Sequence, residues 1–236
     1  MFELTQYVWL IWSFFLLIIW AVLYLSLKDR DSKKKMFRVS LATSLLGLTE
    51  PVFVPEYWSP PSLFDLAVMT GFDIESLLFS FGVGGIAVVV YDYFFKVGYE
   101  EIPEAVQRQA RHRFHYVALL SGPVMFAMLY ALTDLNPIYS AIIALTIGGF
   151  AAWFCRPDLK VKMLVSAGIF TALYYGYFLS LLIFFPGYVE SVWNQQALIG
   201  IFITGVPLEE LLFAASFGFV WSSIYEHVMW RTPKTV

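Results

Sequence analysis

Residues 204–213 read Thr-Gly-Val-Pro-Leu-Glu-Glu-Leu-Leu-Phe and place two adjacent carboxylates, Glu209 and Glu210, at the start of a long apolar run. Residues 70–79, which lie 134 positions earlier, read Thr-Gly-Phe-Asp-Ile-Glu-Ser-Leu-Leu-Phe and repeat most of this pattern. The same offset continues without a gap and aligns residues 91–92 with residues 225–226 as Tyr-Asp over Tyr-Glu. The chain therefore contains a duplicated unit, and each copy opens a predicted helix with acidic residues.

The composition is that of a membrane protein. Hydrophobic residues make up 59% of the 236 residues, charged residues make up only 14%, and the mean hydropathy is +0.70. A soluble domain of this size needs far more charge on its surface. The first apolar run, residues 7–27, is longer than the core of a signal peptide, and we expect it to remain in the mature chain.

Seven runs are long enough, or nearly so, to cross the bilayer as helices of about 20 residues. They are residues 6–27, 36–54, 73–95, 114–133, 137–155, 163–185 and 207–230.

The basic residues set the predicted orientation of these spans. All 15 Lys and Arg residues fall within residues 28–38, 96–113, 156–162 and 231–236, which are every second connection and the C-terminus. Because basic loops stay on the cytoplasmic side, the N-terminus is predicted outside and the C-terminus in the cytoplasm.

The repeat turns these spans into a predicted architecture. We expect an all-α polytopic membrane protein in which two parallel three-helix repeats, residues 1–95 and 137–236, are joined by a cytoplasmic linker and a fourth helix in residues 96–136. This 3+1+3 order gives both repeats the same orientation. Both acidic helix starts then lie at the extracytoplasmic level.

The two outer connections also resemble each other. Each contains a tryptophan, Trp58 or Trp193, and then a short apolar segment, residues 63–69 or 197–203, that is too short to span the bilayer. We expect interfacial or half-buried turns that cover the acidic helix starts. An alternative is that both tryptophans only anchor the chain at the membrane interface.

The acids at the helix starts are the first candidates for chemistry. Glu75 and Glu209 occupy equivalent positions just inside apolar helices, where an acid is costly unless it has a function. Favourable interaction with the helix dipole is the alternative, and it explains Glu210 or Asp73 well. Adjacent residues point about 100° apart on a helix, so Glu209 and Glu210 cannot both face one cavity.

Three further acids lie inside or at the ends of the predicted helices. Glu50 precedes Pro51 well inside the second predicted span, and an intramembrane carboxylate beside a proline kink is a functional candidate. Asp92 and Glu226 lie 17 residues beyond Glu75 and Glu209, about 25 Å along the helix. We expect these two to snorkel or to pair with the basic loops.

The sequence predicts no cofactor, no metal site and no nucleic-acid partner. Cys155 is the single cysteine, and the three histidines, His112, His115 and His227, lack a metal-ligand spacing and are expected to be solvated or interfacial. Nucleotide-binding glycine motifs are absent from the sequence, as is a soluble basic face.

These motifs resemble the small membrane lycopene cyclases of bacteria, archaea and fungi. The resemblance rests on the two acidic helix starts, on Thr49-Glu50 before Tyr57-Trp58, and on the closing Tyr225-Glu226, and the chain is similar to the fused form of this two-subunit family. The family pattern, Pro-x-Glu followed by an acid, is matched in full by Pro207, Glu209 and Glu210. The first copy departs from it with Asp73 and Ser76.

The resemblance implies an isomerase of carotenoid biosynthesis that cyclises the linear ends of lycopene or a related carotenoid without net redox change. An acid protonates a terminal alkene, the cation closes the ring, and a different proton leaves. It implies catalytic roles for Glu209, Glu75, Glu210 and Glu50, with Glu209 leading. Substrate contacts are expected from Phe79, Phe213, Trp58, Trp193 and Asp73.

The implied setting is an integral protein of the cell membrane, with a long apolar isoprenoid substrate and membrane lipid as its partners. Self-association and contact with other carotenoid enzymes stay open. So do the ring type, the exact substrate and whether one or both ends react.

Two other readings of the sequence remain. A small carrier of the SWEET or PQ-loop type shares the 3+1+3 order, although the Pro-Gln dipeptide typical of those carriers is missing from this sequence. A carotenoid hydratase or a carotenoid-binding subunit would use a similar apolar cavity.

Overall fold

The apolar runs fold into long helices, as the sequence predicts, because a helix satisfies its backbone polar groups internally. The computed structural model describes residues 6–235. Its long helices are α2 (Val8–Ser26), α3 (Arg30–Ser44), α6 (Ile74–Phe95), α8 (His115–Leu132), α9 (Pro137–Cys155), α10 (Lys160–Phe184) and α12 (Leu208–Val228).

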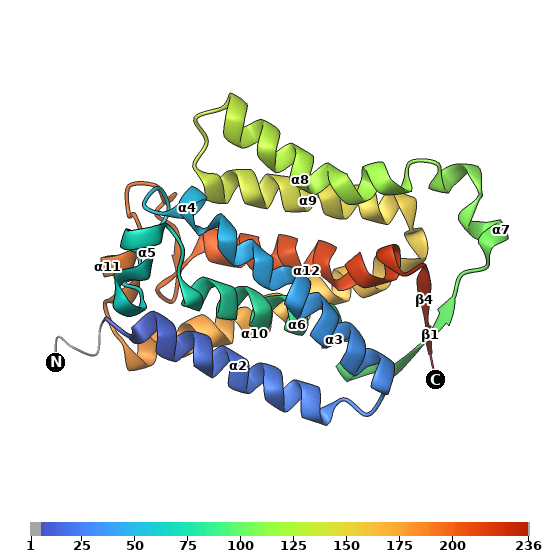
Figure 1. The fold of residues 1–236 in the computed structure, drawn as a ribbon, viewed down its shortest axis with the longest axis horizontal. Coiled ribbons are helices and arrows are strands. Elements are labelled where there is room, and N and C mark those ends of the chain that lie inside the picture. The colour runs from blue at the N-terminus through green and yellow to red at the C-terminus, as the bar shows by residue number, and fades with distance from the viewer. Residues whose placement is uncertain (1–5, 236) are drawn as a thin grey trace.

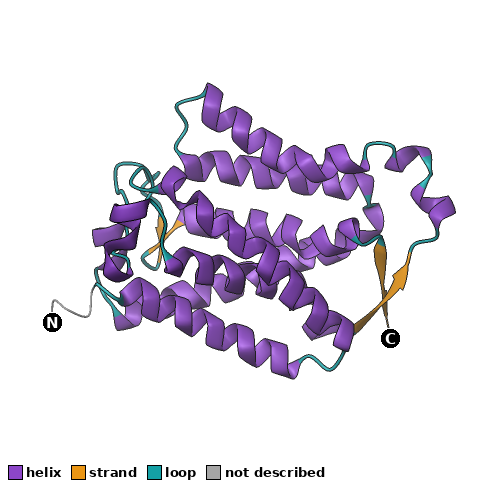
Figure 2. Cartoon of the chain, in the orientation of Figure 1, coloured by secondary structure: helices purple, strands orange, loops and turns teal. Residues whose placement is uncertain are grey.

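Short elements connect the long helices. The short helical turns are η1 (Leu45–Thr49), α4 (Glu50–Phe53), η2 (Leu63–Asp65), α5 (Leu66–Thr70), α7 (Glu104–Gln107), η3 (Ala110–His112), η4 (Pro157–Leu159) and α11 (Tyr188–Val192). Strand β1 (Val97–Glu101) pairs with β4 (Arg231–Thr235), and β2 (Phe202–Ile203) pairs with β3 (Val206–Pro207), both antiparallel. Figure 2 shows the two pairs at opposite ends of the helices. The all-helical prediction missed these two small sheets.

Five helices within residues 6–235 are long and apolar enough to cross a membrane: Val8–Ser26, Ile74–Phe95, His115–Leu132, Pro137–Cys155 and Pro157–Phe184. Helix α3 has only 15 residues, and α12 has 21 but includes three glutamates. The chain is therefore a helical membrane protein, whereas the seven-span arrangement stays a prediction.

The second predicted span, residues 36–54, is broken rather than kinked. Helix α3 ends at Ser44, the chain continues through the 3-10 turn η1, and α4 begins at Glu50. Pro51 lies in the first turn of α4, where its missing N–H costs no hydrogen bond.

The two acidic helix starts are built differently. Asp73 caps α6 by accepting a hydrogen bond from the Ser76 amide at 2.5 Å. Helix α12 instead follows the β2–β3 hairpin, whose two-residue turn has positive φ at Thr204 (49°) and Gly205 (89°). Turns with two positive φ angles match the twist of paired strands. The helix predicted from residue 207 begins at Leu208, and the residues before it form a hairpin that the sequence did not predict.

The long helices form one bundle, with α8 and α9 paired along one side of it (Figure 1). Helix α3 packs closely on α6 because α6 has glycines at the contact: a Cβ at Gly84 would overlap Thr43, and one at Gly85 would overlap Ser40. Helices α4, α5 and α11 gather at the end of the bundle near the N-terminus, and β1 and β4 lie at the opposite end.

A buried ionic cluster joins five elements at the β1–β4 end. Lys35 of α3 contacts Asp92 of α6 and lies 3.0 Å from Glu226 of α12. Lys162 of α10 lies 2.5 Å from Glu226 and 3.6 Å from Asp92. Tyr99 of β1 accepts hydrogen bonds from both lysines and donates one to Asp92 at 2.5 Å. The predicted pairing of Asp92 and Glu226 with basic residues is confirmed, but the groups are buried rather than snorkelling.

The cluster predicts a large effect of removing one cation. Lys162→Met leaves Asp92 and Glu226 to share Lys35, and an uncompensated buried charge costs about 3–5 kcal/mol of unfolding free energy. Unfolding by sodium dodecyl sulfate in mixed micelles, followed by tryptophan fluorescence, measures this loss. The exposed neighbour Lys160→Met is the control. Adding Glu226→Gln to Lys162→Met should recover most of the lost stability, and no recovery would contradict the pairing.

Candidate functional site

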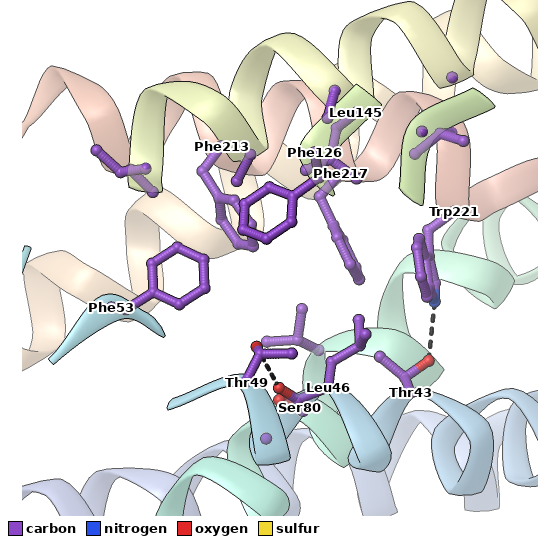
Figure 3. A pocket seen from close by; sticks show the side chains of 18 of the residues that line it. Thr43, Leu46, Thr49, Phe53, Ser80, Phe126, Leu145, Phe213, Phe217 and Trp221 are labelled. Atoms are coloured by element: carbon purple, nitrogen blue, oxygen red, sulfur yellow. Dashed lines mark hydrogen bonds between the residues drawn. The ribbon is translucent and has the colours of Figure 1, made fainter. Parts of the chain in front are cut away.

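A long apolar cavity of about 480 Å³ lies between the α8–α9 pair and the rest of the bundle. Figure 3 shows Phe126, Leu145 and Phe213 on one side of it, and Leu46, Thr49 and Ser80 on the other. Along α12 its lining runs from Glu210 to His227, which corresponds to about 25 Å of helix. A cavity of this shape suits an elongated apolar molecule.

Glu210 lies in the wall at one end of this cavity and is held by three donors. Its Oε1 accepts hydrogen bonds from the Tyr57 hydroxyl at 2.7 Å and the Trp193 indole at 2.9 Å, and its Oε2 accepts one from the Tyr174 hydroxyl at 2.8 Å. Burial raises the pKa of Tyr57 well above its usual value, and the adjacent Glu210 raises it further, so Tyr57 stays a donor. Three donors stabilise the ionised carboxylate.

Glu50 lies in the wall of the same cavity but is held less firmly. Its side chain is buried, and Oε1 accepts no hydrogen bond of ordinary geometry from the described residues. An ionised carboxylate with a buried, unbonded oxygen is costly, whereas a protonated acid is tolerated. Glu50 and Glu210 therefore present two carboxyl groups with different surroundings to one cavity.

Glu75 and Glu209 point away from the cavity and bind the outer connections. Glu75 Oε1 accepts a hydrogen bond from the Leu63 amide at 2.7 Å, and Glu209 Oε1 accepts one from the Ile199 amide, also at 2.7 Å. The Tyr139 hydroxyl adds a second bond to Glu209 at 2.8 Å. Both carboxyls are buried, and each holds the loop that precedes its own helix.

The predicted divergence of Glu209 and Glu210 is thus confirmed: one faces the loop and the other faces the cavity. The structure does not bring Glu209 and Glu75 together in the cavity wall, so their catalytic role stays a prediction.

The two outer connections meet through their tryptophans. Trp58 and Trp193 form an antiparallel bridge with ring centroids 5.3 Å apart, flanked by hydrogen bonds from Ser59 N to Val192 O (2.8 Å) and from Asn194 N to Tyr57 O (2.9 Å). Both tryptophans line the cavity, and Trp193 is buried. The alternative that both are only interface anchors is therefore wrong.

Of the other predicted substrate contacts, two lie in the cavity wall and one does not. Phe79 and Phe213 line the cavity, but Asp73 serves as the cap of α6. Tyr57 and Tyr174, which donate hydrogen bonds to Glu210, were not predicted as site residues from the sequence. Tyr57 was visible beside Trp58, but its partner lies 153 residues away in the chain.

The histidine expectation is wrong. His112, His115 and His227 are all buried, because η3, α8, α9 and the end of α12 converge at the β1–β4 end of the bundle. His115 Nδ1 lies 3.3 Å from Cys155 Sγ, and His112 Nδ1 lies 3.6 Å from the same sulfur. The sequence spacing of the histidines could not show this proximity, because His112, His115 and Cys155 come from η3, α8 and α9.

Removing the Glu209 carboxylate should loosen the loop around Ile199, because the Ile199 amide binds this carboxylate. Glu209→Ala deletes the acceptor for the Ile199 amide and the Tyr139 hydroxyl, and a hydrogen bond to a charged group contributes about 1.5–3 kcal/mol. Amide hydrogen exchange at Ile199 should therefore accelerate by at least about tenfold. Glu190→Ala, which removes an exposed acid on α11, should leave that exchange unchanged. Equal protection in both variants would refute the contact.

Comparison with known proteins gives one family match. Residues 136–228, which include α9, α10, α11 and the Glu209–Glu210 helix start, match the family model described as lycopene cyclase. Searches of curated proteins and of solved structures found no match. The matched segment supplies Glu210, Trp193 and Tyr174 to the cavity. The match supports membership of this chain in the lycopene cyclase family, whose name points to carotenoid biosynthesis and to a carotenoid-cyclising enzyme.

Proposed function

We propose that this protein cyclises the linear end groups of lycopene or a related carotenoid by a proton-initiated reaction without net redox change. The observation that carries the proposal is the long apolar cavity with two differently held carboxyl groups, Glu50 and Glu210, in its wall. The family match over residues 136–228 supports it.

The dimensions of the cavity favour one end group at a time. Its volume of about 480 Å³ falls within the range of about 300–1,000 Å³ that is common for sites of small ligands, and it is too small for a whole carotenoid. One end group and part of the polyene occupy it, while the rest of the chain extends into the bilayer. The second end then reacts after release and re-entry.

The reaction is an isomerisation, so its protons balance. One proton adds to the terminal alkene and leaves a tertiary cation, the neighbouring double bond attacks that cation and closes the ring, and loss of a different proton forms the new double bond. The site must therefore contain a proton donor and a proton acceptor.

The two carboxyls suit these two roles. Glu50 acts as the proton donor, because its apolar surroundings and unbonded oxygen favour the protonated acid. Glu210 accepts the departing proton or stabilises the cation, because Tyr57, Trp193 and Tyr174 hold it as a carboxylate. The aromatic faces of Phe79, Phe213 and Trp58 stabilise the cation and exclude water.

Glu209 and Glu75 act mainly as positioning residues in this proposal. Each fixes one outer connection, and the two connections meet at Trp58 and Trp193 beside Glu210. The sequence instead favours Glu209 as the leading acid, and the two assignments give different results for Glu209→Gln. An amide oxygen still accepts the Ile199 hydrogen bond but cannot deliver a proton.

We also propose the seven-span topology for the protein in the cell membrane, with α3 to α4 and α12 as the additional spans. The N-terminus is then extracytoplasmic and the C-terminus cytoplasmic, as the distribution of basic residues indicates. The Glu50–Glu210 end of the cavity lies toward the outer side.

Substitution of the two cavity acids tests the mechanism. Glu210→Gln and Glu50→Gln should each lower the yield of cyclic carotenoid by about 100-fold or more, since an amide neither gives nor takes the required proton. The measurement is pigment chromatography after expression in a lycopene-accumulating bacterium. Glu56→Gln, an exposed acid beside Tyr57, is the matched control and should retain wild-type yield.

Each outcome has a separate meaning. Unchanged lycopene in cells expressing the wild-type protein contradicts the proposed function, and hydroxylated acyclic products indicate hydration of the cation. Full activity of Glu50→Gln contradicts its role as donor. Loss of activity in Glu209→Gln, with Ile199 exchange preserved, supports Glu209 as the acid instead.

The one-end-at-a-time proposal predicts the order of products. A monocyclic carotenoid should accumulate before any bicyclic product, because the first product must leave the cavity before its other end can enter. A time course of pigments after induction measures this order. Appearance of a bicyclic product from the first time point, with no monocyclic species, would contradict it.

A further inference from the structure

Three potential metal ligands converge at the end of the cavity opposite Glu210. They are His112 at the end of η3, His115 at the start of α8 and Cys155 at the end of α9. One ligand atom from each residue lies within 4.8 Å of the other two, and all three residues are buried. The proposed cyclisation makes no use of these groups.

The distances within the cluster fit a shared ion. Cys155 Sγ lies 3.3 Å from His115 Nδ1 and 3.6 Å from His112 Nδ1. A tetrahedral zinc ion with Zn–S near 2.3 Å and Zn–N near 2.0–2.1 Å holds sulfur and nitrogen ligands about 3.5 Å apart. Both sulfur–nitrogen distances therefore already match those of a zinc site, and the two histidine nitrogens lie within 4.8 Å of each other.

The contact on the far side of His115 fixes the tautomer that a metal requires. His115 Nε2 lies 3.1 Å from the carbonyl oxygen of His227, so this nitrogen carries the proton and donates. The lone pair of Nδ1 is then directed toward Cys155. A backbone carbonyl that binds the other ring nitrogen is the usual support of a metal-binding histidine.

An aromatic ring packs on both histidines, and the nearest cation is already paired. The Trp230 ring stacks on His115 with centroids 4.0 Å apart and meets His112 edge-on at 5.2 Å. Arg156 follows Cys155, but its guanidinium is bound by the Asp158 carboxylate at 2.9 and 2.6 Å, which offsets its charge.

We propose that His112, His115 and Cys155 bind a divalent transition ion of the zinc type, with the fourth position open to water or a small ligand. The mixed imidazole and thiolate set suits zinc better than the oxygen-preferring magnesium or calcium ions. The ion joins η3 and α8 to the end of α9. Because α8 packs mainly against α9 and forms one wall of the cavity, the ion fastens that wall.

Metal content and cobalt spectroscopy test this proposal on the full chain. The protein purified in detergent should contain about one zinc equivalent per chain after equilibration with zinc and removal of excess. Replacement of zinc by Co²⁺ should produce a thiolate-to-cobalt absorption band in the near ultraviolet. Zinc below about one tenth of an equivalent in folded wild-type protein, together with no such band, overturns the proposal and leaves a hydrogen-bonded cysteine–histidine cluster.

Matched substitutions separate ligation from packing. Cys155→Ser and His112→Ala should lose the bound zinc and the cobalt band, whereas His112→Cys should keep zinc because a thiolate is also a zinc ligand. Full zinc content in Cys155→Ser overturns the assignment. Helical circular dichroism of each variant reports folding, and if a variant fails to fold, the wild-type metal content and cobalt spectrum still decide.

Discussion

Buried carboxyl groups impose the main constraint on this protein, because an acid inside an apolar bundle must find donors or cations or remain protonated. Glu226 and Asp92 meet two lysines and a tyrosine. Glu75 and Glu209 meet backbone amides of the loops above them. The ionic cluster joins elements that are distant in sequence, whereas Glu75 and Glu209 each hold the loop that precedes their own helix. The acids thus determine how the two repeats and their connections are joined.

Because the chain is duplicated, most of these buried acids have an equivalent acid in the other repeat, but Glu210 does not. Glu75 and Glu209 each bind a backbone amide of the preceding loop, and Asp92 and Glu226 both contact Lys35 and Lys162. Glu210 has Ser76 as its counterpart, and both line the one cavity. The second repeat thus provides a carboxylate at the place where the first provides a hydroxyl. In the first repeat the buried acid of the cavity wall is instead Glu50, which the break after α3 positions.

The sequence predicted the features that depend on local pattern. Apolar runs located the long helices other than α3 to within a few residues, whereas residues 36–54 were predicted for a span whose α-helix is Arg30–Ser44. The repeat located both acidic helix starts, and the helical angle separated Glu209 from Glu210. It could not predict which of these two glutamates faces the cavity, because that depends on the loop whose Ile199 amide binds Glu209. The positive φ angles of Thr204 and Gly205 create that loop geometry.

Other features of the site depend on contacts between distant segments. Tyr57 reaches Glu210 only because the outer connections pair at Trp58 and Trp193, and no sequence spacing signals that pairing. His112, His115 and Cys155 meet because α8 returns along α9. The break at residues 45–49 was also hidden, since Leu45 to Thr49 reads as an uninterrupted apolar helix with one glycine.

In the proposed cyclisation, unequal stabilisation of two similar groups gives the cavity its chemical direction. If Glu50 and Glu210 had the same surroundings, both would favour the same protonation state, and neither could donate while the other accepted. In that proposal, the three donors on Glu210 favour its carboxylate, whereas the unbonded oxygen on Glu50 favours its protonated acid. The mostly apolar lining of the cavity would also limit the access of water to a cation in this mechanism. The loops fixed by Glu75 and Glu209 preserve this difference, because they hold Tyr57 and Trp193 against Glu210.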